Sequence, residues 1–157
     1  MKNNGHVFEQ EFKNSVPIYM YSKKLKVSGM NYKGGGNECD YLVYSKPNLF
    51  LFELKSHKGK SLPFEKIREN QLIGLSNYSR LDGVVSGVII NFRDYEKTFY
   101  IPIRDLIVFM STTERKSIPI EWCEEHGVLV EQKKLRTRYK YDIEKLISEI
   151  KEDNNNG

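Results

Sequence analysis

Asp40-Tyr-Leu-Val-Tyr44 and Leu49-Phe-Leu-Phe-Glu-Leu-Lys55 are two apolar stretches separated by a short turn around Pro47. Aromatic and branched residues bounded by turn residues predict the two strands of a hairpin. The second stretch is apolar on both faces as far as Glu53, which predicts a central strand that other elements cover on both sides. Asp40 then lies opposite the end of the second strand, so its carboxylate and that of Glu53 are predicted neighbours at one end of a sheet.

The segments around this hairpin complete a mixed sheet with helices. Apolar residues at helical spacing predict helices, and runs of β-branched residues predict further strands. Residues 104–114 fit either a helix or a strand followed by a loop. The order of the segments predicts an α/β fold, with a single domain over residues 1–152, a mixed central β-sheet flanked by helices, and a disordered tail over residues 153–157. The predicted helices are 6–14, 64–80, 119–126 and 141–151, and the further strands are 84–92, 98–103 and 128–131.

Length and composition fit one folded domain. The chain has 157 residues, of which 39% are hydrophobic and 12% aromatic, enough for a real core. A net charge of +4 is mildly basic, which permits a polyanionic partner without requiring one. Cys39 and Cys123 lack the spacing of a zinc site or a disulfide framework, so we expect two reduced thiols. No apolar run is long enough for a membrane span or a signal peptide, so we expect a cytoplasmic protein without membrane contact.

The charged residues at the end of the second strand predict a metal site. Glu53 and Lys55 are two residues apart, so their side chains leave the strand on the same face, close to Asp40. A glutamate in such an apolar strand is costly unless it is paired, and both Lys55 and a divalent cation qualify as partners. A hard cation such as Mg²⁺ prefers carboxylate and carbonyl oxygens, and the carbonyl of Leu54 is a further candidate ligand. The alternative is a solvated salt bridge, but the whole spacing favours the metal site.

These residues resemble the PD-(D/E)XK nuclease superfamily, here as Cys39-Asp40 followed by Glu53-Leu54-Lys55. More narrowly, the chain resembles the RecU-type Holliday junction resolvases and their phage relatives, also described as the penicillin-binding-protein-related factor A family. Cys39 stands where the superfamily often has proline. Further matching stretches, spread over residues 5–147, are Gly5–Pro17, Asn37–Tyr41, Ser61–Pro63, Glu69–Gln71, Gly87–Phe92 and Arg115–Ile118.

The resemblance implies the fold and the chemistry of that superfamily. It implies a restriction-endonuclease-like fold and a metal-dependent DNA endonuclease that resolves Holliday junctions in recombination. Asp40 and Glu53 would bind Mg²⁺, with Mn²⁺ as a substitute, and Lys55 would be the catalytic lysine. The cation would polarise a phosphate oxygen and lower the pKa of a bound water. Symmetric cutting of a four-way junction needs two active sites, so the resemblance also implies a homodimer. It further implies a protein of the bacterial cytoplasm or of a phage-infected cell.

The resemblance assigns roles on two helices as well. Glu9 would be the first-helix carboxylate that supplements the metal site. Glu11 is the competing choice, and the match of Phe8 and Glu9 to the family's opening helix favours Glu9. Gln71 would contact the scissile region of the DNA. The segment 18–39 is shorter than its counterpart in the cellular resolvases, where a projecting stalk helps to engage the junction.

Clustered basic residues predict DNA contacts. Lysine and arginine bind phosphate oxygens, although a run of charge is by itself typical of a solvated surface. On the loop after Lys55, Lys58 and Lys60 are predicted to meet the phosphate backbone near the metal. A basic run near the C-terminus comprises Lys133, Lys134, Arg136, Arg138 and Lys140, beside Tyr139 and Tyr141, and a second patch comprises Lys23, Lys24, Lys26 and Lys33, near Tyr19, Tyr21 and Tyr32.

Two other functions stay open on the sequence alone. A restriction-like or repair nuclease of the same fold would act on duplex or flapped DNA. A DNA-binding recombination accessory module would keep the fold without efficient cleavage. The intact set of Asp40, Glu53 and Lys55 argues against such a module, because a decayed site usually loses one of them.

Overall fold

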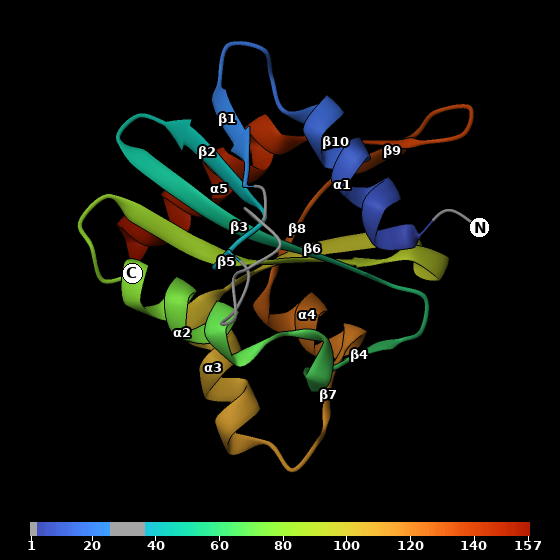
Figure 1. Ribbon diagram of the computed structural model, residues 1–157, viewed down its shortest axis with the longest axis vertical. Helices are drawn as coiled ribbons and strands as arrows, with labels where there is room; N and C mark the ends of the chain where they lie inside the picture. Colours follow the sequence, from blue (N-terminus) through green and yellow to red (C-terminus); the bar gives the residue numbers. More distant parts are fainter. Residues whose placement is uncertain (1–2, 26–36) are drawn as a thin grey trace, which may run out of the picture.

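The computed structural model describes residues 3–25 and 37–157, which build a six-stranded sheet with helices on both faces (Figure 1). The strands lie in the order β1 (Tyr21–Lys24), β2 (Tyr41–Ser45), β3 (Asn48–His57), β5 (Val84–Phe92), β6 (Lys97–Pro102) and β8 (Val128–Leu129). β3 and β5 are parallel, and the other neighbouring pairs of this sheet are antiparallel. The predicted α/β class with a mixed central sheet is therefore confirmed, and the predicted hairpin is the β2–β3 pair.

Helices on the two faces of the sheet define two hydrophobic cores. One face carries α1 (Asn4–Ser15) and α5 (Ile143–Asn156), and the other carries α2 (Glu69–Tyr78), α3 (Ile103–Thr112) and α4 (Ile120–His126). β3 alternates between the cores, because Phe50 and Phe52 pack towards α1 and α5 while Leu51 packs towards α2. This strand is buried on both sides from Phe50 to Leu54, as its apolar sequence predicts.

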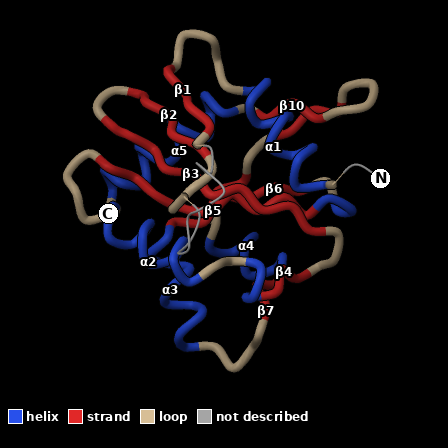
Figure 2. Tube along the Cα trace, in the orientation of Figure 1, coloured by secondary structure: helices blue, strands red, loops and turns tan. Residues whose placement is uncertain are grey.

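Two smaller sheets flank the central one (Figure 2). β4 (Ser61–Pro63) pairs with β7 (Ser117–Pro119), and β9 (Gln132–Lys134) pairs with β10 (Tyr139–Tyr141) in a hairpin. Two short 3-10 turns, η1 (Phe64–Lys66) and η2 (Arg93–Tyr95), follow β4 and β5.

The structure corrects several predicted boundaries. The second helix begins at Glu69 and not at residue 64, because residues 61–66 form β4 and η1 instead. Residues 104–114 are mostly helical, since α3 covers most of them. Neither β1 nor the β9–β10 hairpin follows from the sequence pattern, because their residues are mostly charged or tyrosine and lack an apolar period.

The C-terminal helix runs past the predicted end of the domain at residue 152. The disordered tail predicted for residues 153–157 is wrong for all but the last residue, because α5 continues to Asn156. Lys151 holds this end of the helix, since its ammonium donates to the Ser45 hydroxyl (2.8 Å) and to the Lys46 carbonyl (2.9 Å) in the β2–β3 turn. In the described part of the chain, no helix is long and apolar enough to cross a bilayer.

Candidate active site

A groove of about 680 Å³ opens at the end of β3, between the start of α1 and the start of α2. Its wall draws side chains from both helices, from β3 and from the residue just before β2, so only the tertiary fold makes them neighbours. Leu54, whose carbonyl is a candidate ligand, lines the same groove. The structure brings all five predicted catalytic residues into this wall, namely Glu9, Asp40, Glu53, Lys55 and Gln71.

Asp40 is held just before β2 by its backbone and by its side chain. Its N–H donates to the carbonyl of Phe52 (3.0 Å), and its own carbonyl accepts from the N–H of Leu25 (2.9 Å). The Asp40 Oδ2 accepts a hydrogen bond from the N–H of Leu54 (2.8 Å). Strand pairing therefore fixes the Asp40 carboxylate beside the residues that flank Glu53.

Glu53 is 1% exposed, and its two carboxylate oxygens have different surroundings. Oε1 accepts a hydrogen bond from the Gln71 amide (2.8 Å) and lies 3.1 Å from the Lys55 Nζ. Oε2 is buried and accepts no hydrogen bond from any residue in the described part of the chain. A buried anionic oxygen without a donor is costly, so this atom points to a cation as its partner.

Burial makes both carboxyl groups hard to ionise. Burial, followed by the nearby Asp40, raises the pKa of Glu53 to about 8 against the opposing effect of Lys55. Burial also raises the pKa of Asp40, and the hydrogen bond from Leu54 partly offsets this rise. A divalent cation would favour the charged form of both groups. The pair fits Mg²⁺, which prefers oxygen ligands, keeps several waters and needs only one or two carboxylates.

The third carboxylate of the predicted site is in the groove but already paired. Among residues 3–25 and 37–157, no group of three or more histidine, cysteine, aspartate or glutamate side chains is close enough to hold a metal ion. Glu9 lines the groove, yet its Oε2 forms an ion pair with the Lys24 Nζ (2.5 Å). Glu11, the competing candidate, lies outside the groove wall and pairs with Arg93.

Gln71 uses both ends of its amide inside the protein. Its Nε2 donates to Glu53, while its Oε1 accepts from the N–H of Arg68, the N-cap residue of α2 (3.2 Å). These two partners orient the amide, because only its NH₂ group can donate to a carboxylate. The observed contact of the buried Gln71 is thus with Glu53, and its contact with a scissile phosphate stays a prediction.

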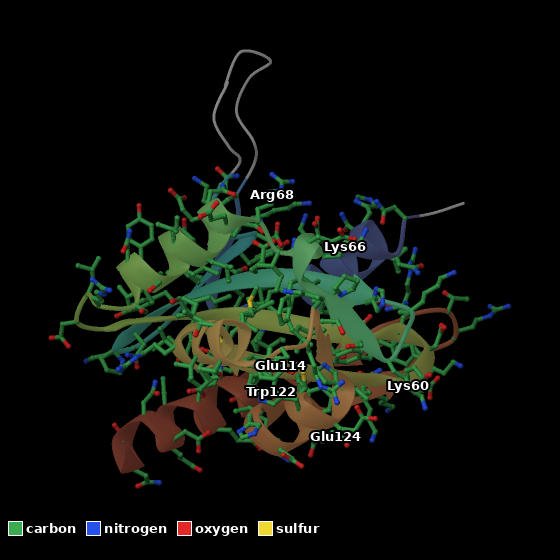
Figure 3. All side chains as sticks on the ribbon, turned by 90° about the horizontal axis from the view of Figure 1, so that it is seen from below. Lys60, Lys66, Arg68, Glu114, Trp122 and Glu124 are labelled. Atoms are coloured by element: carbon green, nitrogen blue, oxygen red, sulfur yellow. The ribbon has the colours of Figure 1, made fainter. Side chains whose placement is uncertain are left out.

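Basic residues surround the groove unevenly. Of the two loop lysines predicted to meet DNA, Lys58 lines the groove, whereas Lys60 lies outside the wall with its ammonium 5.8 Å from the centre of the Tyr95 ring. Lys66 and Arg68 also line the groove, and Figure 3 shows both beside α1 and α2. Neither was predicted to bind DNA. The available signal was their place in the connection between β3 and α2, the two elements that carry most of the site.

The other predicted basic residues lie away from the groove. The basic run at residues 133–140 belongs to the β9–β10 hairpin, outside the groove wall. In the second patch, Lys23 and Lys24 are on β1. Three further residues of that patch, Lys26, Tyr32 and Lys33, fall outside the described residues, as does the part of the short segment 18–39 from 26 to 36.

Most of the chain matches the model of a known protein family. The family described as Recombination protein U matches residues 12–145, a range that includes Asp40, Glu53 and Lys55. The chain belongs to the RecU family. One relative is similar over most of both chains. The SPbeta prophage-derived uncharacterized protein YotM of Bacillus subtilis (strain 168) is 31% identical over 170 residues, which are 94% of this chain and 87% of that protein.

Two proteins named Holliday junction resolvase RecU are similar to this RecU-family chain over a shorter range. The protein from Ureaplasma parvum is 33% identical over 95 residues, which are 60% of this chain and 55% of its own length. The protein from Lactococcus lactis subsp. cremoris is 31% identical over 94 residues, which are 59% of this chain and 44% of its own length. The chain therefore aligns with only part of each of these two resolvases.

A solved structure shares the fold of this RecU-family chain. Hjc of Archaeoglobus fulgidus, a Holliday junction resolvase from an archaeal hyperthermophile, matches with a TM-score of 0.50 and 14% sequence identity. The match covers 70% of this chain and 82% of the Hjc chain. At this identity the likeness supports the fold, while the active site rests on the residues described above.

Proposed function

We propose that this RecU-family chain is a metal-dependent endonuclease that resolves four-way DNA junctions in recombination. The observation that carries the proposal is the buried pair of Asp40 and Glu53, with the unpartnered Oε2 of Glu53, beside Lys55 in an open groove. Membership of the RecU family and the names of the relatives support the choice of substrate.

In this proposal Asp40 and Glu53 hold the cation, which we assign as Mg²⁺ with Mn²⁺ as a substitute. When bound, the cation supplies Lewis-acid polarisation of the phosphodiester and lowers the pKa of a water. Lys55, whose Nζ lies 3.1 Å from Glu53, stabilises the negative charge that develops on the phosphate. Gln71 donates to Oε1 of Glu53 and so keeps the carboxylate in one orientation.

Other residues of the groove act on the DNA or complete the site. Lys58, Lys66 and Arg68 line the groove and bind phosphates near the cut. Glu9 serves as the third carboxylate after its side chain turns from Lys24 towards the cation, because no three carboxylates of the described residues lie close enough to share one ion. Symmetric cutting of a junction requires two such grooves, so we propose a two-fold homodimer.

The first test is cleavage of a labelled synthetic four-way junction, with and without Mg²⁺, by the wild type and by Asp40→Asn. We expect paired nicks that depend on metal in the wild type and none in the variant, because the amide removes one of the two charges that hold the cation. Asp105→Asn is the matched control. Asp105 is exposed on α3 and outside the groove wall, so this variant should cut like the wild type.

The same protein and a panel of substrates separate the alternatives. Equal cutting of linear duplex, flap and junction would favour a restriction-like or repair nuclease. Junction binding without cutting in Mg²⁺ or Mn²⁺ would favour a non-cleaving recombination accessory module. Sedimentation of the protein–junction complex tests the homodimer, and a complex with one chain per junction would contradict it.

A further inference from the structure

The β9–β10 hairpin, residues 132–141, is a sheet of its own beside the six-stranded sheet. A two-stranded hairpin is only marginally stable in water, so other contacts must hold it. Along the outer edge of β10, the N–H of Tyr139 donates to Oε2 of Glu11 (2.8 Å) and the N–H of Tyr141 donates to the hydroxyl of Ser15 (2.9 Å). Two side chains of α1 thus take the place of a third strand.

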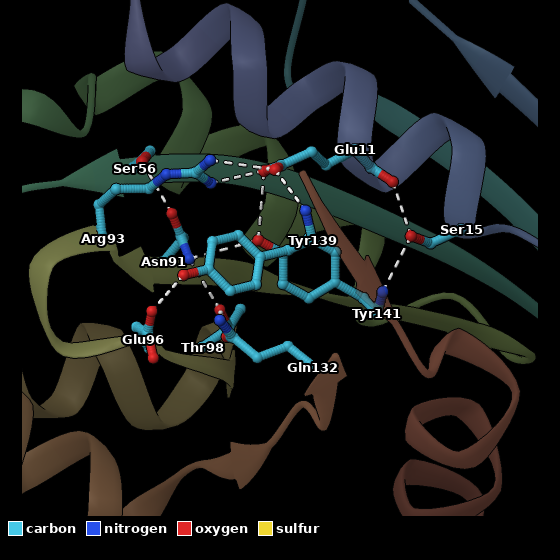
Figure 4. A network of polar contacts seen from close by, with 10 residues as sticks. All are labelled: Glu11, Ser15, Ser56, Asn91, Arg93, Glu96, Thr98, Gln132, Tyr139 and Tyr141. Atoms are coloured by element: carbon cyan, nitrogen blue, oxygen red, sulfur yellow. Dashed lines mark hydrogen bonds and ion pairs between the residues drawn. The ribbon is translucent and has the colours of Figure 1, made fainter. Parts of the chain in front are cut away.

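A buried ion pair fixes the Glu11 carboxylate that accepts from the hairpin (Figure 4). Arg93, in η2, donates to both carboxylate oxygens of Glu11, at 2.5 and 3.0 Å. Its guanidinium also lies 5.1 Å from the centre of the Tyr139 ring. The Glu11 side chain is 1% exposed and that of Arg93 17%, so losing either partner would leave a largely buried charge alone, which is strongly destabilising. The base of the hairpin is therefore fixed against α1 and the end of β5.

The same network reaches the wall of the groove (Figure 4). Asn91, on β5, donates to the Tyr141 hydroxyl (3.4 Å) and accepts from the Ser56 hydroxyl (2.9 Å). Ser56 follows Lys55 on β3 and lines the groove. One connected set of hydrogen bonds thus sets the position of the hairpin relative to the candidate active site.

The hairpin presents its cations to solvent, fully at Lys133, Lys134, Arg136 and Lys140 and partly at Arg138. Lys134 pairs with Glu96 (3.5 Å), but no other basic side chain of the hairpin forms an ion pair with a residue that the structure describes. Unneutralised cations on a fixed support suit a phosphate backbone, whose binding releases counterions. The unpaired cations are Lys133, Arg136, Arg138 and Lys140.

We infer that the β9–β10 hairpin is a second DNA-contacting arm and that Glu11 and Arg93 are the positioning residues that hold it. The arm binds the phosphate backbone of a DNA segment that extends beyond the groove. This inference rests on the proposed DNA substrate and does not depend on cleavage.

The first experiment measures binding of a labelled four-way junction without divalent metal over a series of salt concentrations. In the double variant Arg136→Gln and Arg138→Gln, the plot of log K against log salt concentration should become less steep by about 1 to 2, roughly 0.9 for each phosphate that is no longer neutralised. Arg104→Gln, at an exposed position on α3, is the control and should keep the wild-type slope. An unchanged slope in the hairpin variant would overturn the inference.

The second experiment tests the positioning role with Glu11→Gln, which keeps every basic residue of the hairpin. We expect a higher KM for the junction with little change in kcat, and a salt slope less steep than in the wild type. A merely structural role would lower thermal stability and leave the salt slope unchanged. Amide hydrogen exchange in the wild type tests the anchor even if this variant folds poorly. Tyr139 and Tyr141 should exchange more slowly than Thr137 at the exposed tip, and equal rates would overturn the anchoring.

These outcomes separate the arm from the proposed nuclease activity. A wild type that binds junctions through the hairpin without cutting them in Mg²⁺ would leave the arm in place and refute the proposed function. A wild type that cuts junctions while the hairpin variants keep its salt slope would refute the arm alone.

Discussion

Glu53 has one carboxylate oxygen that accepts from Gln71 and lies beside Lys55, while the other is buried without a donor among the described residues. Buried polar groups that serve stability alone are nearly always hydrogen-bonded. The asymmetry of Glu53 therefore suits a carboxylate that shares a cation with Asp40 while its second oxygen is oriented by neighbours. At the scale of the residue, the proposed cation site accounts for a glutamate in an otherwise apolar strand.

Glu53→Gln should separate stability from function. The new amide has hydrogens to donate to the Asp40 carboxylate, so we expect the metal-free variant to match the wild type in stability or to gain about 1 kcal/mol. Cleavage should fall by about 10³-fold, because the cation loses a charged ligand. Thermal melting in the presence of a chelator and single-turnover cleavage measure the two effects. A variant that loses stability and keeps its activity would contradict this prediction.

Gln71→Leu should weaken metal binding without removing a ligand. Glu53 then loses the donor that orients its Oε1, and such supporting interactions are typically worth about 10- to 100-fold in metal affinity. Calorimetric titration with Mn²⁺ measures the change, and Asn77→Leu, at an exposed position on the same helix, is the control. Normal Mn²⁺ affinity combined with weaker junction binding would instead assign Gln71 to DNA contact.

At the scale of elements, the β3–α2–β5 crossover assembles the candidate site, because β3 carries Glu53 and Lys55 while α2 carries Gln71. The tight packing of β5 against β6 depends on Gly87. A Cβ added there would lie 2.4 Å from the Tyr100 ring and 2.5 Å from the Ile101 carbonyl oxygen. A buried ring and a strand backbone cannot move aside without disturbing the sheet.

Gly87→Ala should therefore lower the free energy of unfolding by about 1 to 3 kcal/mol, the usual cost of overpacking a core. Urea denaturation measures the change. Gly59→Ala is the control, because its Cβ would meet the end of the His57 side chain at 3.0 Å, and that ring can rotate away. We expect the control to change stability by less than about 0.5 kcal/mol. Equal losses in the two variants would refute this account of Gly87.

At the scale of the whole molecule, the core between the sheet and helices α2, α3 and α4 encloses both cysteines. Burial raises the pKa of the Cys123 thiol to about 12, with smaller contributions from nearby glutamates. A thiol whose pKa is raised carries less thiolate at any given pH, and the thiolate is the reactive form. Both the protonation state and the packing therefore protect Cys123 from reagents.

An aromatic disulfide reagent at pH 8 should react with neither Cys39 nor Cys123 of the native protein within minutes. The same reagent should titrate both thiols once guanidinium has unfolded the chain, which provides the internal control. Absorbance of the released thiolate gives the count. Rapid reaction of the native protein would show that this core opens far more readily than its burial indicates.

The sequence by itself determined the central hairpin, the α/β class and the grouping of Asp40, Glu53 and Lys55. All of these depend on short-range rules. A strand with period 2 decides which side chains share a face, and a short turn decides which residues of two strands are opposite. The buried strands were predictable for the same reason, because a run of apolar residues is visible within one short segment of the sequence.

Only the tertiary structure placed Glu9 in the groove wall and Glu11 outside it. The two side chains point about 160° apart around α1. The docking of the helix, with Phe8 and Phe12 in the core, turns Glu9 to the groove and Glu11 to Arg93. The pairing of β9 with β10 and the placement of Lys66 and Arg68 in the groove wall likewise followed from no local pattern. Their positions depend on contacts between residues far apart in the chain, such as Tyr139 with Glu11, and no periodicity within one segment encodes such a contact.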